Sequence, residues 1–293
     1  MIIKDLLKKI LNKEQRRSLC LCHQRWMARG DIFWSRVVNI FPVGLRVFLK
    51  AHIQVRRRMD HPRLSIFIDV SSAMENDVRT RSCSKEPETV AWIETFRAGD
   101  VFWDIGANVG AYALVAAKQH EGRVKVYAVE PSVLNFAQLC RNIALNHCGE
   151  IITPLNIALS DKTAVGKFHY HNWVAGGAMH AFGAAVGCDQ AAFQPVFSQD
   201  ILSYSLDDVV AAFGLAMPDH IKIDVDGLEP EIMNGARRIL SDKKKVRSLL
   251  VEIAEKDAPL VAFLGDCGFQ MAEKHLQGHG DSKLYNCIFT RGN

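Results

Sequence analysis

The stretch Val101-Phe-Trp-Asp-Ile-Gly-Ala-Asn-Val-Gly110 decides the fold of this chain. Its first half is typical of a short buried strand, and its glycines indicate a turn that leads into a helix. Further along, Val126-Tyr-Ala-Val-Glu130 has the pattern of a second buried strand that ends in a carboxylate. In α/β folds this combination holds a nucleoside, because glycines let the backbone approach the ligand and the acid accepts hydrogen bonds from ribose. The sequence therefore predicts an enzyme that uses a nucleoside-bearing cofactor.

Strands and helices alternate beyond this point, which predicts an open, mostly parallel sheet with helices on both faces. We expect strands at 101–105, 124–130, 151–157, 220–225, 247–253, 268–272 and 283–290, and helices at 110–118, 132–145, 229–240 and 257–265. No helical pattern joins the last two strands, so they should form a hairpin whose final strand is antiparallel. The connection after 157 is expected to be irregular and to form a lid.

The N-terminal segment differs from the rest of the chain in its charge. The net charge is +4, but residues 1–60 hold 14 Lys/Arg against 4 Asp/Glu, so the remainder is acidic. Apolar side chains recur there at helical spacing, from Ile2 to Leu11 and again from Ile32 to Val55 with an interruption at Pro42. We therefore expect a basic amphipathic helical extension over 1–62 and a catalytic domain over 63–293. Two interpretations stay open for residues 1–60: peripheral contact with an anionic membrane, or a helical cap on the catalytic domain.

Composition limits the remaining classes of function. No apolar run reaches the ~18 residues of a membrane-spanning helix. We therefore expect a cytoplasmic protein, and peripheral contact with the inner face of the membrane is compatible with that location. Because the basic charge belongs to residues 1–60, the main domain is not expected to bind nucleic acid. The eight cysteines lack the spacing of a zinc site, so we expect reduced thiols and no metal there.

The glycine turn discriminates between nucleoside cofactors. Gly106-Ala-Asn-Val-Gly110 lacks the G-x-G-x-x-G pattern of dinucleotide sites, and no Lys or Arg lies between Gly106 and Ala117 to meet a pyrophosphate. A nucleoside without phosphates fits this turn better. S-adenosylmethionine is the commonest cofactor of that kind.

Blocks of this sequence resemble the FkbM-type methyltransferases, which are class I S-adenosylmethionine-dependent enzymes. The blocks are Gly99–Gly110, Val129–Pro131, Asn156–Asp161 and His220–Glu229, and the likeness covers about residues 83–255. The resemblance implies a Rossmann-like class I methyltransferase fold, whose seven-stranded, mostly parallel sheet has an antiparallel last strand. It also implies an O-methyltransferase that acts on a hydroxyl of a sugar, glycolipid, polysaccharide or related small-molecule acceptor.

The same resemblance assigns the cofactor-binding residues. Asp104, Gly106, Asn108 and Gly110 would line the methionyl part, Glu130 would hold the ribose, and Asn156 and Ala158 would edge the adenine. In many members of the family glutamate stands at the position of Asp226, so the carboxylate here is on a shorter side chain.

The segment Ile221-Lys-Ile-Asp-Val-Asp-Gly227 places charges in a strand that should be buried on both faces. Buried charges are costly unless they are paired or used. Asp224, Asp226 and Glu229 lie at the carboxyl end of this strand, where open α/β sheets bind ligands, and are our candidates for the group that removes the hydroxyl proton. A divalent cation held by them is an alternative that we do not favour. The structural interpretation is a Lys222–Asp224 ion pair followed by an acid that caps a helix.

The connection between the third and fourth core strands carries the candidate acceptor-binding residues His169, His171 and Trp173. Histidine and aromatic side chains of this kind hydrogen-bond and stack on polyhydroxyl compounds, and a histidine base is the rival to the acidic segment. Two other functions stay open. One is a non-catalytic, membrane-associated scaffold with a methyltransferase fold. The other is an N-methyltransferase, although Asp-Val-Asp-Gly stands where an N–P–P–Y type motif would be expected.

Overall fold

The computed structural model describes residues 37–187, 191–254, 258–277 and 284–291, which form parts of two compact units, residues 1–54 and 55–293. In the first unit the described residues contain the helix α3 (Val43–His52), which starts after Pro42 as predicted and buries none of its side chains. The predicted helix at the N-terminal end of the chain lies outside the described residues. Among the described helices, none combines the length and the hydrophobicity needed to cross a bilayer.

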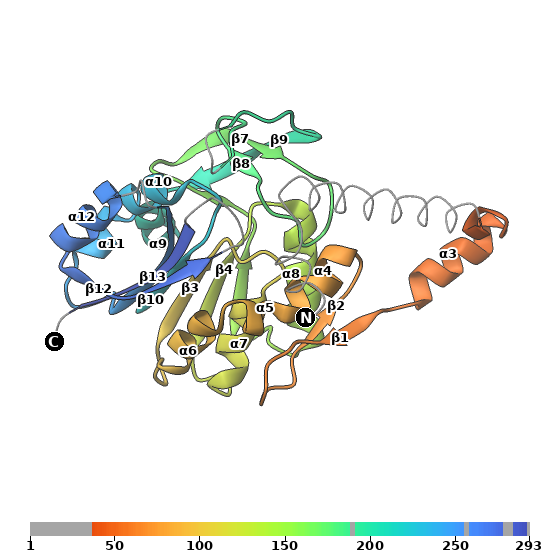
Figure 1. The fold of residues 1–293 in the computed structure, drawn as a ribbon, viewed down its shortest axis with the longest axis horizontal. Helices are drawn as coiled ribbons and strands as arrows, with labels where there is room; N and C mark the ends of the chain where they lie inside the picture. The colour runs from red at the N-terminus through yellow and green to blue at the C-terminus, as the bar shows by residue number, and fades with distance from the viewer. Residues whose placement is uncertain (1–36, 188–190, 255–257, 278–283, 292–293) are drawn as a thin grey trace, which may run out of the picture. The chain divides into compact units, whose positions relative to one another are not determined.

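The second unit is built on a seven-stranded sheet (Figure 1). Its strands are β3 (Val101–Ile105), β4 (Lys125–Val129), β5 (Ile152–Leu155), β10 (His220–Ile223), β11 (Ser248–Ala254), β12 (Phe269–Gln277) and β13 (Leu284–Arg291). Their order is β12-β13-β11-β10-β3-β4-β5, and β13 runs antiparallel to both of its neighbours. The predicted class I methyltransferase fold with an antiparallel last strand is therefore confirmed.

Helices cover both faces of this sheet. On one face, α6 (Pro87–Glu94), α7 (Ala111–Gln119) and α8 (Val133–Leu145) pack against Phe102, Val126 and Leu250. On the other, α9 (Leu206–Phe213), α10 (Glu229–Asn234), α11 (Arg237–Ser241) and α12 (Ala258–Asp266) pack against Trp103, Tyr127 and Ile221. The single helix predicted over 229–240 is two helices. They are separated at Gly235, where a Cβ atom would lie 2.1 Å from the carbonyl oxygen of Ser160.

A short N-terminal layer precedes the core strands. The strands β1 (Arg56–Arg58) and β2 (Phe67–Asp69) form an antiparallel pair, followed by α4 (Ala73–Asp77), η1 (Arg79–Arg81) and α5 (Ser82–Lys85). Two asparagine side chains bond the backbone of β2: Asn142 in α8 accepts from the Asp69 amide (2.8 Å), and Asn146, directly after α8, accepts from the Phe67 amide (2.9 Å). These bonds attach the layer to the core.

The connection that we expected to be irregular contains a second sheet, so that expectation was wrong over residues 158–204. Its strands are β6 (Ala158–Leu159), β7 (Ala164–Tyr170), β8 (Ala181–Phe182) and β9 (Phe197–Tyr204), in the order β6-β9-β7-β8. The helix α9 that follows was also missed. The sheet buries few apolar side chains, chiefly Ala158, Phe168, Tyr170 and Ile201, so the hydrophobic alternation that reveals a strand is weak here.

Candidate functional site

The glycine turn between β3 and α7 is shaped by close contacts that only glycine permits. Gly106 has a φ of +80°, and a Cβ atom there would lie 1.9 Å from the carbonyl oxygen of Asp224. Gly110 has a φ of +87°, and a Cβ atom there would lie 2.5 Å from Leu139 Cδ1. The turn therefore brings the ends of β3 and β10 together, at the edge of the sheet where α/β folds bind ligands.

Glu130 follows β4 and faces the same turn. Its Oε2 accepts a hydrogen bond from the Asn108 amide (2.8 Å), and its Oε1 accepts from the Ser132 amide (2.9 Å) and from Asn135 Nδ2 (3.4 Å). Burial raises the pKa of this carboxyl to about 7 in spite of those donors. A carboxylate can accept about four hydrogen bonds, so Oε2 keeps acceptor capacity for a further donor such as a ribose hydroxyl.

Asp104 is a buried carboxylate near the carboxyl end of β3. Its side chain is 1% exposed, and neither carboxylate oxygen makes a well-formed hydrogen bond among the described residues, although the nearby Ala113 amide in the first turn of α7 acts to lower its pKa. Burial raises its pKa to about 6, although the neighbouring Lys222 opposes that shift. An unpaired buried carboxylate is costly, and a positively charged hydrogen-bond donor would satisfy it. The ammonium group of a methionyl moiety is such a donor, so Asp104 fits the predicted cofactor.

Lys222 in β10 and Asp224 directly after that strand form an ion pair, as the structural interpretation of the sequence predicted. Lys222 is fully buried, its Nζ lies 2.6 Å from Asp224 Oδ2, and it lies 5.1 Å from the centre of the Tyr112 ring. Burial by itself would raise the pKa of Asp224, but Lys222 lowers it below the usual range. Asp224 is thus held as a carboxylate that is neutralised by lysine.

Asp226 and Glu229 have different surroundings from Asp224. Asp226 is half-buried with a φ of +62°, and burial together with the nearby Asp224 raises its pKa to about 6. Glu229 is buried at the start of α10 and accepts from the amides of Val225 and Gly227 (both 3.3 Å). Burial raises the pKa of Glu229 to about 7. Asp224 is held in an ion pair and Glu229 is buried, so Asp226 is the acid of the three that is both partly accessible and outside the ion pair with Lys222.

Glu252, which was not among the candidate residues, belongs to the same edge. Val251 pairs with Ile223, so Glu252 in β11 lies level with Asp224, which directly follows β10. Burial, with repulsion from Asp224 and Asp226, raises the pKa of Glu252 to about 9. The signal in the sequence was the same as for Asp224, an acid at the carboxyl end of a buried strand.

Residues 172–180, which we name the covering loop, lie over the glycine turn. Asn108 Nδ2 and Asn135 Nδ2 both donate to the carbonyl oxygen of Gly177 (2.8 and 3.0 Å), and the Gly176 amide donates to Asn135 Oδ1 (2.9 Å). On the outer side, Arg79 Nε donates to the carbonyl oxygen of Gly176 (2.9 Å). The loop is therefore fixed to residues on both sides of Glu130.

The covering loop also reaches the acidic strand end. The Met179 amide donates to Asp226 Oδ2 at 2.6 Å. Gly176 and Gly177 are closely packed, since Cβ atoms there would lie 2.9 Å from Glu75 Cγ and 2.2 Å from Asn172 Oδ1. The expected lid is thus a short, tightly bonded loop that joins the glycine turn to Asp226, and the rest of the connection is sheet.

The candidate acceptor residues lie in and beside this loop. Trp173 is 50% exposed and packs edge-on to Tyr170 and Phe197. His171 is exposed, with its ring 5.2 Å from that of Phe193. His169 lies in β7, where its ring nitrogens bond Ser198 Oγ (2.8 Å) and the carbonyl oxygen of Gly183 (3.0 Å). This geometry gives His169 a structural role in the second sheet and leaves Trp173 and His171 accessible.

The candidate adenine residues follow β5. Asn156 Nδ2 donates to the carbonyl oxygens of Glu130 (2.8 Å) and Pro131 (3.1 Å), so it fixes the turn that carries the ribose candidate. Ala158 is buried in β6 with the apolar cluster of the second sheet. Asn156 therefore positions Glu130. Ala158 packs in the second sheet, between whose strands β7 and β8 the covering loop lies.

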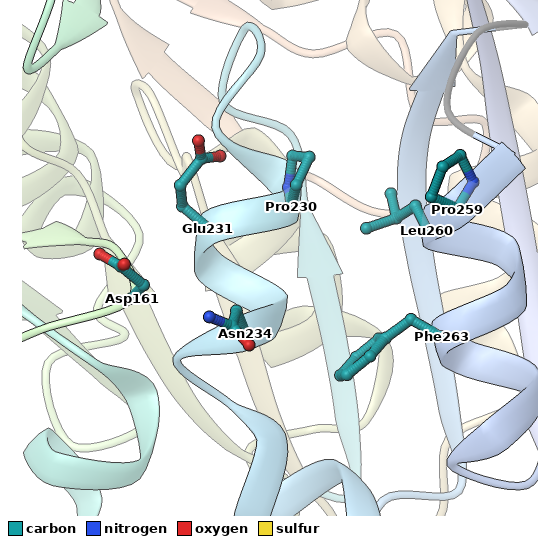
Figure 2. A pocket seen from close by; sticks show the side chains of 7 residues that line it. All are labelled: Asp161, Pro230, Glu231, Asn234, Pro259, Leu260 and Phe263. Atoms are coloured by element: carbon teal, nitrogen blue, oxygen red, sulfur yellow. The ribbon is translucent and has the colours of Figure 1, made fainter.

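No three of the described His, Cys, Asp and Glu side chains come together in a geometry that could hold a metal ion. A separate cavity of about 350 Å³ lies between α10 and α12 (Figure 2). It is lined by Asp161, Pro230, Glu231, Asn234, Pro259, Leu260 and Phe263. None of the candidate site residues lines this cavity, so it is distinct from the glycine turn and from the acidic strand end.

Comparisons with known proteins match the sequence to one family. The model of the methyltransferase FkbM domain matches residues 104–271, more than half of the chain. The chain is 26% identical over 194 residues to 31-O-demethyl-FK506 methyltransferase FkbM of Streptomyces tacrolimicus, covering 59% of this chain and 74% of that protein. It is 25% identical over 182 residues to hexuronic acid methyltransferase AglP of Haloferax volcanii, covering 62% and 67%. Methyltransferase sdnD of Sordaria araneosa is 26% identical over 200 residues, covering 59% and 75%.

Proposed function

The chain belongs to the FkbM methyltransferase family, and we propose that it methylates a hydroxyl group of a sugar, glycolipid, polysaccharide or related small-molecule acceptor. It is an S-adenosylmethionine-dependent methyltransferase. Two relatives support the acceptor class by their names: one acts on a hexuronic acid, and the other is named for an O-demethylated compound.

The unpartnered carboxylate of Asp104 is the observation that carries the proposal. S-adenosylmethionine supplies, when bound, a methyl group on a positively charged sulfur, and it also has an ammonium group. Asp104 would accept hydrogen bonds from that ammonium, and Glu130 would accept them from the ribose hydroxyls. The remaining proposed cofactor-binding residues are Gly106, Asn108 and Gly110 on the methionyl side, and Asn156 and Ala158 on the adenine side.

Asp226 is our proposed acceptor of the hydroxyl proton. A general base works best when its pKa lies near the operating pH, and burial raises the pKa of Asp226 to about 6. It is half-buried and bonded to the covering loop, so a hydroxyl held beneath that loop would reach it. Asp224 would fix the backbone after β10 through its ion pair with Lys222. Glu229 would hold the following turn by accepting hydrogen bonds from its backbone amides.

The covering loop is the proposed acceptor side of the site. The accessible indole of Trp173 would stack on a sugar ring, and His171 would hydrogen-bond its hydroxyls. His169 would keep β7, β8 and β9 in register beneath them.

The test is methyl transfer from radiolabelled S-adenosylmethionine to glucuronic acid glycosides and to carbohydrate extracts, followed by identification of the labelled position. We expect the label on a hydroxyl oxygen. The variant Asp226→Asn should transfer about 100-fold more slowly with unchanged cofactor affinity, while Asp242→Asn, an exposed control, should match the wild type. Label recovered on nitrogen would contradict the proposed acceptor class.

We further propose that residues 1–60 contact an anionic membrane surface. The support is α3, which exposes Val43, Val47 and Phe48 and carries Arg46 and Lys50. Exposed apolar side chains between basic ones suit the boundary of an anionic bilayer, because the first enter the acyl region and the second pair with headgroups.

A further inference from the structure

Lys222 lies directly opposite Asp104 in the main sheet. The strands β10 and β3 are parallel neighbours, and in their register Lys222 pairs with Asp104. Residues that are paired in this way project from the same face of a sheet, on strands about 4.8 Å apart. Each of the two side chains is 1% exposed. Because buried charges are stable when they are paired, a direct ion pair between this ammonium and this carboxylate would be expected.

Lys222 is bonded to a different acid. Its Nζ donates to Asp224 Oδ2 at 2.6 Å and lies 5.1 Å from the centre of the Tyr112 ring, which belongs to α7. Asp104, in contrast, makes no well-formed hydrogen bond among the described residues. The ion pair that the register favours is therefore replaced by one with Asp224, and the carboxylate of Asp104 is left open.

Glu86 is the acid whose charge acts most strongly on Lys222 after Asp224 and Asp104, and it already has other partners. Its Oε1 accepts from Lys85 Nζ (2.6 Å), and its Oε2 accepts from Thr89 Oγ1 and from Asn286 Nδ2 (both 3.4 Å). If the charge of Asp224 were removed, Lys222 would therefore turn to Asp104, the carboxylate paired with it across the two strands.

Resting on the proposed function, we propose that Asp224 is a positioning residue, which holds Lys222 away from Asp104 and so keeps Asp104 open to the ammonium group of the cofactor. An ion pair between Lys222 and Asp104 would occupy that carboxylate and place a positive charge where the cofactor's own positive charge would bind. The glycine turn keeps Asp224 in place, because Gly106 packs so closely on its carbonyl oxygen that a Cβ atom there would lie 1.9 Å away.

Calorimetric titration of the full chain tests this role with two ligands, S-adenosylmethionine and 5′-methylthioadenosine, a thioether nucleoside without an ammonium group. Asp224→Asn keeps the shape of the side chain but loses its charge, so Asp104 becomes the stronger acceptor for Lys222. We expect this variant to bind S-adenosylmethionine about 10- to 100-fold more weakly, because the charge-assisted hydrogen bond of Asp104 is no longer available. Its affinity for 5′-methylthioadenosine should be unchanged.

A second substitution should reverse the loss. In the double variant Asp224→Asn with Lys222→Met, the apolar part of the lysine side chain is kept and its charge is removed, so Asp104 is open again. We expect this protein to bind S-adenosylmethionine as tightly as the wild type. Glu150→Gln, an exposed control in the turn before β5, should bind both ligands as the wild type does.

Three results would overturn the inference alone. They are wild-type affinity of Asp224→Asn for S-adenosylmethionine, an equal loss of affinity for both ligands in that variant, and a double variant that binds S-adenosylmethionine weakly. The last result would mean that Asp224 contacts the cofactor itself, and it decides against the inference even if Asp224→Asn does not fold. Binding of neither ligand to the wild type would overturn the proposed function and the inference with it.

Discussion

Asp104 combines two opposite contributions in one side chain. As an unpartnered buried carboxylate it destabilises the free protein, and as the proposed partner of the cofactor's ammonium group it favours binding. Removing the charge of Asp104 should therefore stabilise the free protein and weaken cofactor binding, whereas a residue with only a structural role would not have these opposite effects. Substitution by asparagine, which has nearly the same shape and no charge, tests the separation.

For Asp104→Asn we expect the free energy of unfolding without ligand to rise by about 1–3 kcal/mol at pH 8, because burial raises the pKa of the native carboxyl. The dissociation constant for S-adenosylmethionine should increase about 10- to 100-fold, since a charge-assisted hydrogen bond is lost. Chemical denaturation and calorimetry measure the two quantities. Asp266→Asn, at an exposed position on α12, is the control. An unchanged affinity would remove Asp104 from the cofactor site.

A second prediction concerns the Cβ atom that a substitution would add at the two glycines of the turn. Alanine at Gly106 would place its Cβ against a backbone oxygen at 1.9 Å, whereas alanine at Gly110 would meet the movable end of Leu139 at 2.5 Å. Both have positive φ. We expect Gly106→Ala to cost about 3–5 kcal/mol and Gly110→Ala about 1–3 kcal/mol. Urea denaturation gives both values, and equal costs would mean that the contact with Asp224 does not hold the turn.

The candidate site was partly predictable because several of its residues end buried strands. Glu130 and Asp224 each follow an apolar run, and that pattern located them from the sequence, whereas Asp104 was assigned through the family resemblance. Glu252 has the same signal but was not recognised, since its strand carries no second charge. Asn135 and Arg79 carried no signal, because they act through the covering loop, whose path depends on glycine packing between distant segments.

At the scale of elements, a buried polar network joins α6 to the amino ends of β10 and β11. His220 bonds Asp100 Oδ2 through Nε2 (2.9 Å) and Ser248 Oγ through Nδ1 (2.7 Å), and Trp92 Nε1 donates to the same hydroxyl (2.8 Å). The order Ser–His–Asp resembles a hydrolytic triad. Its serine already has two partners, all three side chains are buried, and the network lies at the end of the sheet opposite the glycine turn. Its role is therefore structural.

This network predicts a loss of stability in acid. Burial lowers the pKa of His220 from 6.5 to about 4, so between these values the unfolded chain binds a proton that the native protein excludes. The free energy of unfolding should therefore fall as the pH falls from 6.5 to 4, by about 3 kcal/mol from this residue. Denaturation of wild type and His220→Gln at pH 7 and pH 4 measures it. If His220→Gln loses as much stability between pH 7 and pH 4 as the wild type does, His220 is not the source of the acid sensitivity.

The main sheet was predictable and the second sheet was not, for a physical reason. Strands such as β3 and β11 are buried on both faces and are mostly apolar, which stands out in a sequence although each contains one acid. In β7 and β9 the buried residues are few, two in each strand, and they alternate with intermediate or exposed ones. Their pairing depends on partners many residues away, which a local pattern does not reveal.

At the scale of the whole molecule, charge is divided between two units. The basic residues concentrate in 1–60, whereas the rest of the chain is acidic. This division favours the proposed contact of residues 1–60 with an anionic bilayer, because basic residues are attracted to anionic headgroups. The absence of nucleic acid binding by the main domain stays a prediction.

Vesicle binding tests that division. The double variant Arg46→Glu with Lys50→Glu should bind vesicles of phosphatidylglycerol about 10-fold or more weakly than the wild type, at about 1 kcal/mol per charge removed near the surface. Cosedimentation gives the affinities. Lys244→Glu, at an exposed position in the second unit, should have no effect. Equal binding to neutral and anionic vesicles would contradict an electrostatic contact.

The central claim is that one sulfonium nucleoside fills the space between the glycine turn and the ends of β3 and β4. A crystal structure of the full chain grown with S-adenosylmethionine tests it most directly. We predict the ligand's ammonium group on Asp104 and its ribose hydroxyls on Glu130, beneath the covering loop. Density for the ligand elsewhere, with Asp104 and Glu130 untouched, would contradict the account.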